Sequence, residues 1–312
     1  MKILVPDYYP HFRCIAEKCR HNCCIGWEID IDEDTHHYYK SVGGDFGVRL
    51  RENIEEGECP HFILGEHERC PFLNRENLCD IYISLGEEHL CSICADHPRF
   101  RNYIGGRCEM GLGLSCEAAG KLILTWDKPC GWIEYGEEDG ETDTSEWEEE
   151  ILAKRNAVTE ILRDRDKSVA DRVHELFEDA FLGRSAGEWR EYFSTLERMD
   201  EKWDGMLACL TEENAAWTEG LVPDLMWENL LVYFVNRHTP DAADEWDLDA
   251  RIGFAVLGYA VIRTVIEGMH REKGTVTSDD LVETARMYSS EIEYSEENTA
   301  VLMDEIFADL DL

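Results

Sequence analysis

Cysteine is distributed very unevenly along this chain, and the distribution limits what the chain can fold into. Twelve of the 13 cysteines lie within the first 130 of 312 residues, and Cys209 is the remaining one. The first 14 residues lack the apolar core of a secretory signal, so we expect a cytoplasmic protein whose thiols stay reduced. There, clustered cysteines indicate metal or redox chemistry before they indicate a disulfide framework.

Charge divides the chain at the same place. Residues 1–130 carry 14 Lys and Arg against 22 Asp and Glu, whereas residues 131–312 carry 16 against 46. We therefore predict a Cys-rich metal- or iron–sulfur-binding domain over 1–130, an acidic linker over 131–145 and a helical domain over 146–312. The formal net charge of −38 argues against nucleic acid as a partner, because phosphate binding needs a basic face.

The acidic region has the apolar periodicity of an all-α bundle. Thr277 or Ser278, and also Ser295, precede acidic residues in the pattern of helix N-caps. Apolar residues recur at helical spacing from residue 151 onward, and we expect the later helices over 222–237, 247–271, 278–292 and 296–309.

The most apolar stretch of the chain, residues 252–266, is predicted to be a core helix. It contains Arg263 and is too short to span a bilayer. The net charge also disfavours docking on an anionic membrane surface, so no membrane partner is expected.

The Cys-rich region lacks long periodic segments. Its short apolar pieces, such as 27–31 and 80–83, alternate with Gly, Pro and Cys. Metal ligation would stabilise such a loop-rich segment, because the free energy of metal binding becomes free energy of folding. The predicted fold is therefore mainly α, with an irregular Cys-rich metal-binding N-terminal region followed by an all-α helical bundle.

The spacing of the cysteines carries the metal prediction. Cys19 and Cys23 would share one face of a helix, whereas Cys23 and Cys24 would point about 100° apart. Cys91 and Cys94 have the two-residue spacing common to zinc knuckles and iron–sulfur loops. Two centres, or one centre with spare thiols, and either iron or zinc, are compatible with this spacing. The candidate ligands are Cys14, Cys19, Cys23, Cys24, Cys70, Cys79, Cys91 and Cys94.

Other polar residues are weaker candidates. His97 follows Cys94 by three residues and is either a metal ligand or a hydrogen-bond donor beside a metal ligand. Gly111-Leu-Gly-Leu is not expected to bind a nucleotide, because no flanking strand and helix are evident. The remaining side chains of note are expected to be packed thiols, surface or loop histidines and solvated carboxylates: Cys59, Cys108, Cys130 and Cys209; His36, His37 and His238; Asp96, Glu109 and Glu117.

Several motifs together resemble one known family, the flagellin lysine-N-methylases. The N-terminal part of that family belongs to the wider CxxCxxCC proteins, which are described as zinc- or iron-chelating. The likeness covers most of the chain. It rests on Val5-Pro-Asp-Tyr-Tyr, Cys19-x3-Cys23-Cys24-x2-Trp27, Cys70-Pro-Phe-Leu, Leu78-Cys79-Asp-Ile-Tyr, Cys91-x2-Cys94-x2-His97-Pro-Arg99, Glu109-Met-Gly-Leu-x-Leu-Ser-Cys116-Glu, Glu228-Asn-Leu-Leu-Val-Tyr-Phe and Tyr294-Ser-Glu-Glu-Asn.

The resemblance implies an S-adenosylmethionine-dependent methyltransferase that acts on lysines of flagellin or another protein. It also implies a centre held by cysteines, either a [4Fe–4S] cluster or zinc. The radical C-x3-C-x2-C loop is not reproduced, because Gly26 stands at the third cysteine position. No general base is identified. The candidate groups beside the metal centre are Tyr82, Asp96, His97 and Arg99.

Two non-enzymatic functions stay open alongside the methyltransferase. In the first, zinc or iron only holds the N-terminal region together while the helical region binds a partner. In the second, surplus thiols act as a reversible redox sensor. The enzyme is favoured by the family resemblance and not by any catalytic constellation.

Overall fold

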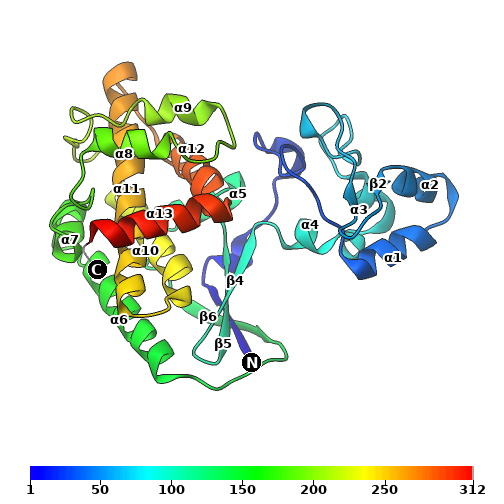
Figure 1. Cartoon of the computed structure of the whole chain (residues 1–312), viewed down its shortest axis with the longest axis horizontal. Coiled ribbons are helices and arrows are strands. Elements are labelled where there is room, and N and C mark those ends of the chain that lie inside the picture. The colour runs from blue at the N-terminus through cyan, green and yellow to red at the C-terminus, as the bar shows by residue number, and fades with distance from the viewer. Residues whose placement is uncertain (311–312) are drawn as a thin grey trace. The chain divides into compact units, whose positions relative to one another are not determined.

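The structure is a computed structural model that describes residues 1–310, and the chain forms two compact units (Figure 1). Residues 13–100 form one, here called the thiol unit. Residues 1–12 together with 101–312 form the other, the helical unit. These bounds differ from the regions predicted from the sequence, because the first strand of the chain pairs with strands that follow residue 100.

A four-stranded sheet in the order β4-β5-β1-β6 explains this division. The first strand pairs in parallel with β5, where Lys2 lies opposite Arg107, and antiparallel with β6. Residues 132–137, which the sequence places in an acidic linker, form β6 instead. Because β6 is an edge strand, its glutamates face water while its backbone pairs. The strands are β1 (Lys2–Pro6), β4 (Arg99–Ile104), β5 (Arg107–Leu112) and β6 (Trp132–Glu137).

The fold is mainly α, as predicted, with 13 α-helices among the described residues. The thiol unit contains α1 (Glu33–Ser41), α2 (Gly44–Glu52), α3 (Asp80–Leu85) and α4 (Ser92–Asp96), with the short strands β2 (Ile54–Glu55) and β3 (His61–Phe62). The helical unit contains α5 (Glu117–Leu124), α6 (Glu146–Leu162), α7 (Val169–Leu176), α8 (Ala186–Phe193), α9 (Lys202–Leu207), α10 (Asp224–His238), α11 (Glu245–Lys273), α12 (Ser278–Tyr288) and α13 (Glu296–Asp309).

The long helix α11 forms the core of the helical unit. It contacts α10, α12 and α13, which lie around it in Figure 1. This helix is long and apolar enough to cross a membrane, but 94% of its most apolar window is buried inside the protein. The prediction of a core helix over 252–266 is therefore confirmed.

The predicted N-caps of the last two helices are also confirmed. Thr277 caps α12 in a capping box, in which its side chain and that of Asp280 each accept the other's backbone N–H. Ser295 caps α13 by accepting the N–H of Asn298. Between these helices the chain forms a π-helical turn, Ser289–Glu293, where the sequence predicts continued α-helix.

Glu109 in β5 is buried, although the sequence suggests a solvated carboxylate. Arg155 of α6 donates from its two terminal nitrogens to the two carboxylate oxygens, at 2.6 and 2.8 Å. Arg107 donates to Oε1 at 2.7 Å. Glu109 and Arg155 are only 1% and 2% exposed, so the pair joins the sheet to α6 in a water-free environment.

Replacing Arg155 with methionine is expected to lower the free energy of unfolding by about 3–5 kcal/mol, because a buried carboxylate loses a bidentate partner. The matched control is Lys154→Met, which removes a largely exposed ion pair with Asp249 and is expected to cost less than about 1 kcal/mol. Urea unfolding measures both values. Equal losses in the two variants would contradict the structural role of the buried pair.

The thiol unit has a hydrophobic core of its own, although few regular elements were expected there. Tyr39, Leu50 and Phe72 are among its fully buried residues. Two of the predicted metal ligands, Cys70 and Cys91, are also part of this core. These two cysteines are therefore built into the core of the unit.

Candidate functional sites

The structure brings most of the predicted metal ligands together in the thiol unit. Cys70 and Cys91 belong to the hydrophobic core, and Cys24, Cys79 and Cys94 pack against it. These five residues are here called the thiol cluster. They come from three parts of the sequence, so the folded unit gathers the motifs that the sequence keeps apart.

Backbone pairing and short helices position the thiol cluster. The N–H of Cys70 donates to the carbonyl of Cys24 at 2.9 Å. Cys79 immediately precedes α3, and Cys91 immediately precedes α4. The Sγ atoms of Cys91 and Cys94 lie 3.3 Å apart, because α4 places residues three apart on one face.

The thiols of the cluster influence one another's ionisation. Burial and the charges of nearby Cys79 and Cys91 raise the pKa of Cys70 to about 11. A hydrogen bond to Cys91, followed by burial, raises the pKa of Cys94, and the same hydrogen bond lowers that of Cys91. Once one thiol is ionised its neighbours resist losing their protons, because like charges close together repel.

Cys23 lies at the edge of the cluster. It is hydrogen-bonded to Cys24, and this bond lowers the pKa of Cys23 to about 7. Cys14 and Cys19 lie outside the cluster. The Cys14 sulfur accepts the N–H of Ala16, and the Cys19 thiol donates to the carbonyl of His21.

The shared helical face predicted for Cys19 and Cys23 is wrong. A short 3-10 helix ends at Lys18, and Cys19 is extended. The Asn22 side chain accepts the N–H of Cys24 at 2.9 Å, a local hydrogen bond that competes with helix formation.

The four residues proposed to lie beside the metal centre occupy different environments. Tyr82 on α3 is 51% exposed, and Asp96 is the last residue of α4. The His97 ring lies 5.7 Å from that of Trp27, and burial together with Arg99 lowers the pKa of His97 to about 4. Arg99 donates to the carbonyl of Ala95. His97 is therefore expected to be a neutral imidazole at neutral pH.

Sequence reasoning missed a buried polar network in the helical unit. Its centre is Glu293, whose fully buried side chain comes from the π-helical turn, a feature frequent at functional sites. Helix α10 supplies three partners. His238 Nε2 lies 2.7 Å from Oε1 of Glu293, Arg237 Nε lies 3.2 Å from the same oxygen, and the Tyr233 hydroxyl donates to the carboxylate at 3.2 Å.

Electrostatics fix the charge states in this network. Burial favours the neutral form of Glu293, but Arg237 and the hydrogen bond to His238 outweigh it and hold the pKa of Glu293 below its ordinary value. Burial lowers the pKa of His238 and raises that of Tyr233. At neutral pH the network therefore contains a carboxylate, a guanidinium, a neutral imidazole and a protonated phenol.

The turn after β5 contacts this network, and one premise of the expectation for Gly111-Leu-Gly-Leu, the lack of a flanking strand and helix, is wrong. A strand and a helix do flank it, since β5 ends at Leu112 and α5 begins at Glu117. The N–H of Leu114 donates to the Tyr233 hydroxyl at 3.2 Å. A Cβ atom on Gly113 would lie only 2.2 Å from the Tyr294 hydroxyl, so this close approach requires glycine.

Tyr294 is the accessible member of the network at 36% exposed, and the Arg237 guanidinium lies 5.2 Å from the centre of its ring. Tyr233 and Tyr294 both lie in motifs that carry the family resemblance, and that signal could have found them. The prediction that His36 and His238 lie on the surface or in loops is wrong. His238 is buried and hydrogen-bonded to Glu293, and His36 is buried on α1.

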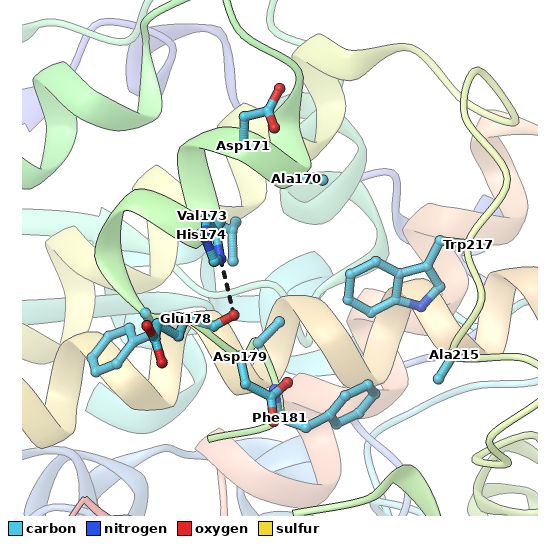
Figure 2. A pocket seen from close by; sticks show the side chains of 11 residues that line it. Ala170, Asp171, Val173, His174, Glu178, Asp179, Phe181, Ala215 and Trp217 are labelled. Carbon is cyan, nitrogen blue, oxygen red and sulfur yellow. Dashed lines mark hydrogen bonds between the residues drawn. The ribbon is translucent and has the colours of Figure 1, made fainter. Parts of the chain in front are cut away.

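A separate cavity of about 370 Å³ lies beside α7 (Figure 2). Phe181 and Trp217 form part of its wall, and the Trp217 indole donates to Thr264 at 3.0 Å. The dashed line in Figure 2 joins the His174 ring to the carbonyl of Glu178 at 2.9 Å. Neither the thiol cluster nor the Glu293 network lines this cavity.

Comparison with known proteins gives matches to lysine methylases. A family model, the FliB lysine N-methylase C-terminal domain, matches residues 137–311. The Lysine-N-methylases of Salmonella choleraesuis (strain SC-B67) and Salmonella typhimurium (strain LT2) are each 27% identical over 128 residues, which is 38% of this chain and 31% of theirs. The flagellar biosynthetic protein FliU of Salmonella muenchen is also 27% identical over 128 residues and is covered over 75% of its length.

The match thus spans about a third of the length of these two Lysine-N-methylases. No solved structure matches the chain significantly. The family model covers α6 to α13, and so includes the α10 and π-turn residues of the Glu293 network. It does not cover the thiol unit, so the likeness to CxxCxxCC proteins stays a prediction.

Proposed function

This chain belongs to the FliB lysine N-methylase family through its C-terminal domain, and on that basis we propose that it is an S-adenosylmethionine-dependent protein lysine N-methyltransferase. The observation that carries the proposal is the family match over residues 137–311, more than half of the chain. The proposed substrate is flagellin or another lysine-bearing protein. The acidic surface of the chain suits a lysine-bearing segment, because opposite charges steer association.

Methyl transfer to lysine sets three physical requirements. The lysine nitrogen forms a bond to the methyl carbon while the bond from that carbon to the sulfonium breaks, and S-adenosylhomocysteine leaves. The amine must first lose its proton to water, because an ordinary lysine, with a pKa of about 10.4, is protonated at neutral pH. It must also be held in line with the sulfonium, with water largely excluded.

The Glu293 network supports these requirements within the helical unit. Tyr294 is the partly exposed side chain of the network, and its proposed role is to contact the substrate amine. The proposed role of Glu293 is to hold Tyr233, and through it the turn at Leu114, in a fixed position. Glu293 is therefore a positioning residue in this proposal.

The thiol cluster is the proposed holder of the inorganic centre. A tetrahedral zinc ion with Zn–S bonds of about 2.3 Å needs sulfur atoms about 3.8 Å apart. Among the described residues, no three thiols belong to a group whose ligand atoms all lie within 4.8 Å of one another. The proposed centre is therefore an iron–sulfur cluster or a zinc ion. When bound, such a centre supplies folding free energy to the thiol unit.

A cytoplasmic location is part of the proposal, because the centre needs reduced thiols. All 13 cysteines are free thiols in the structure, which is consistent with this location. A second candidate function, a non-catalytic metal module, is favoured by the packing of the cluster into a hydrophobic core. It predicts bound metal without methyl transfer.

Incubation of the anaerobically reconstituted chain with methyl-labelled S-adenosylmethionine and flagellin tests the enzyme. Label on flagellin lysines is expected. Tyr294→Phe is expected to lower kcat at least about tenfold with little change in KM, because an interaction with the reacting amine is lost. The matched control is Tyr103→Phe, which alters an exposed tyrosine of β4. If no lysine becomes labelled, the methyltransferase proposal is contradicted and the non-catalytic metal module is favoured.

A further inference from the structure

The cavity beside α7 is a feature of the helical unit that neither candidate site uses (Figure 2). Most of the residues that line it are apolar. Val173 lies on one side, Trp217 lies on the other, and Phe181 closes the wall between them. The volume of about 370 Å³ is near the lower end of the range for small-ligand sites, roughly 300–1,000 Å³. The cavity therefore suits one long side chain or a compact molecule.

The aromatic part of the wall is held in place by its neighbours. The Trp217 indole donates to Thr264 of α11 at 3.0 Å, and the Arg263 guanidinium of the same helix lies 4.9 Å from the centre of the Trp217 ring. The carbonyl of Phe181 accepts the indole N–H of Trp189 at 2.7 Å. The cavity is therefore preformed, so little conformational freedom is lost when a ligand enters it.

The polar groups of the lining accept hydrogen bonds and carry negative charge. They are Asp171, His174, Glu178 and Asp179, and no lysine or arginine is among the described residues that line the cavity. The His174 Nδ1 lies 2.9 Å from the carbonyl oxygen of Glu178, which can only accept, so the neutral ring presents Nε2 as an acceptor. This lining repels an anion, and a wholly apolar ligand would cover carboxylates without satisfying them.

We propose that this cavity receives the side chain of a lysine on a bound protein segment, with the methylene stem against Phe181 and Trp217 and the ammonium beside the carboxylates. Lysine buries its stem along apolar surface while its charged end stays near water. Its compact ammonium donates in three directions and so suits separate acceptors, whereas the planar guanidinium of arginine suits one carboxylate in a bidentate pair. The positive charge of Arg263 beside Trp217 is balanced by Glu219, at 2.8 Å.

The cavity acts in this proposal as a docking subsite and not as the place of reaction. No member of the Glu293 network lines it, so the docked lysine differs from the one proposed to react beside Tyr294. The inference rests on the proposed function in one respect, namely that the bound segment belongs to the protein substrate. Docking of one lysine would raise the effective concentration of another lysine of the same substrate at the reacting site.

Binding of matched capped peptides to the full chain tests the cavity. The first peptide has one lysine flanked on each side by two alanines, and the second has norleucine in place of the lysine. Norleucine keeps the apolar stem but has no charge. The NMR signal of the Trp217 indole N–H, assigned with Trp217→Phe, reports occupancy. The lysine peptide is expected to bind about tenfold more tightly, because the carboxylates attract only the charged peptide.

Removal of one charge from the lining separates docking from catalysis. Glu178→Gln is expected to weaken binding of the lysine peptide about fivefold and to leave binding of the norleucine peptide unchanged. The matched control is Glu175→Gln, which changes a carboxylate that pairs with Lys167 and does not line the cavity. In methylation of flagellin, Glu178→Gln is expected to raise KM with little change in kcat, the reverse of the effect expected for Tyr294→Phe.

Each other outcome counts against the site. An unchanged Trp217 signal would overturn the cavity as the binding place, and equal binding of the two peptides, or tighter binding of the matching arginine peptide, would overturn the choice of lysine. Equal effects of Glu178→Gln and Glu175→Gln would indicate attraction to the acidic surface in general. Ala180→Phe narrows the cavity and is expected to abolish binding of both peptides, with circular dichroism as the check of its fold; retained binding would contradict the proposal.

The peptide measurement needs neither S-adenosylmethionine nor the proposed inorganic centre. A chain that binds the lysine peptide but transfers no methyl group would contradict the proposed function and keep the docking site. A chain that methylates flagellin but does not bind the peptide would do the opposite.

Discussion

The Cys94→Ser variant is expected to lose the proposed inorganic centre and, with it, the folding of the thiol unit. Serine is close to cysteine in size but provides no thiolate, so the variant removes a ligand with little change in packing. Affinity for the centre is expected to fall by more than about 100-fold, since loss even of groups that merely support a metal ligand costs 10–100-fold. Methyl transfer is expected to fall with it.

Metal and sulfide analysis, the absorption spectrum and limited proteolysis of residues 13–100 measure this effect. A brown wild type with about four irons supports a cluster, and a colourless protein with zinc supports the alternative. The control is Cys209→Ser, which changes the cysteine of the helical unit that lies farthest along the chain. If Cys94→Ser keeps the full metal content and protease resistance, the thiol cluster is not the ligand set.

The Glu293→Gln variant is expected to lower the free energy of unfolding of the helical unit by about 3–5 kcal/mol. The change leaves the buried Arg237 guanidinium without its carboxylate. The matched control is Glu134→Gln, which removes an exposed ion pair with Lys2 and is expected to cost less than about 1 kcal/mol. Urea unfolding at pH 8 compares the two variants, and equal effects would contradict the proposed network.

The pH dependence of stability provides a second measurement of the same network. His238 has a pKa below its ordinary value of 6.5, so the unfolded chain takes up protons more readily and stability falls as the pH drops below about 6.5. Glu293 has a pKa below its ordinary value of 4.5, so its contribution is lost as the pH falls below about 4.5. Glu293→Gln is expected to remove the second, more acidic loss and to enlarge the first, because the carboxylate that raises the pKa of His238 is gone.

The helices of the last third of the chain could be predicted because their signals are local. Apolar periodicity and the N-caps Thr277 and Ser295 predicted the bounds of α11 to α13 to within a few residues. The sheet could not be predicted, since β1 and β5 pair across about a hundred residues and neither is strongly patterned. The edge strand β6 was not predicted, because its acidic composition is typical of a linker.

The two candidate sites differ in how far the sequence predicts them. Cysteines are rare and conspicuous, so their spacing marked the residues that the fold gathers around Cys70 and Cys91. Glu293 is one of 68 acidic residues, and nothing in its neighbourhood marks it as buried. Only the packing of α10 against the π-helical turn distinguishes it, and that packing is a property of the folded chain.

The pairing of β1 with β5 constrains the order of events during synthesis. The strand β1 is synthesised first, but it cannot pair with β5 until Arg107 and the residues after it have been synthesised. The thiol unit is complete by residue 100, so it emerges earlier. Domains generally fold as units while the chain is being made. The nascent thiol unit therefore has time to fold before the N-terminal strand pairs in the sheet.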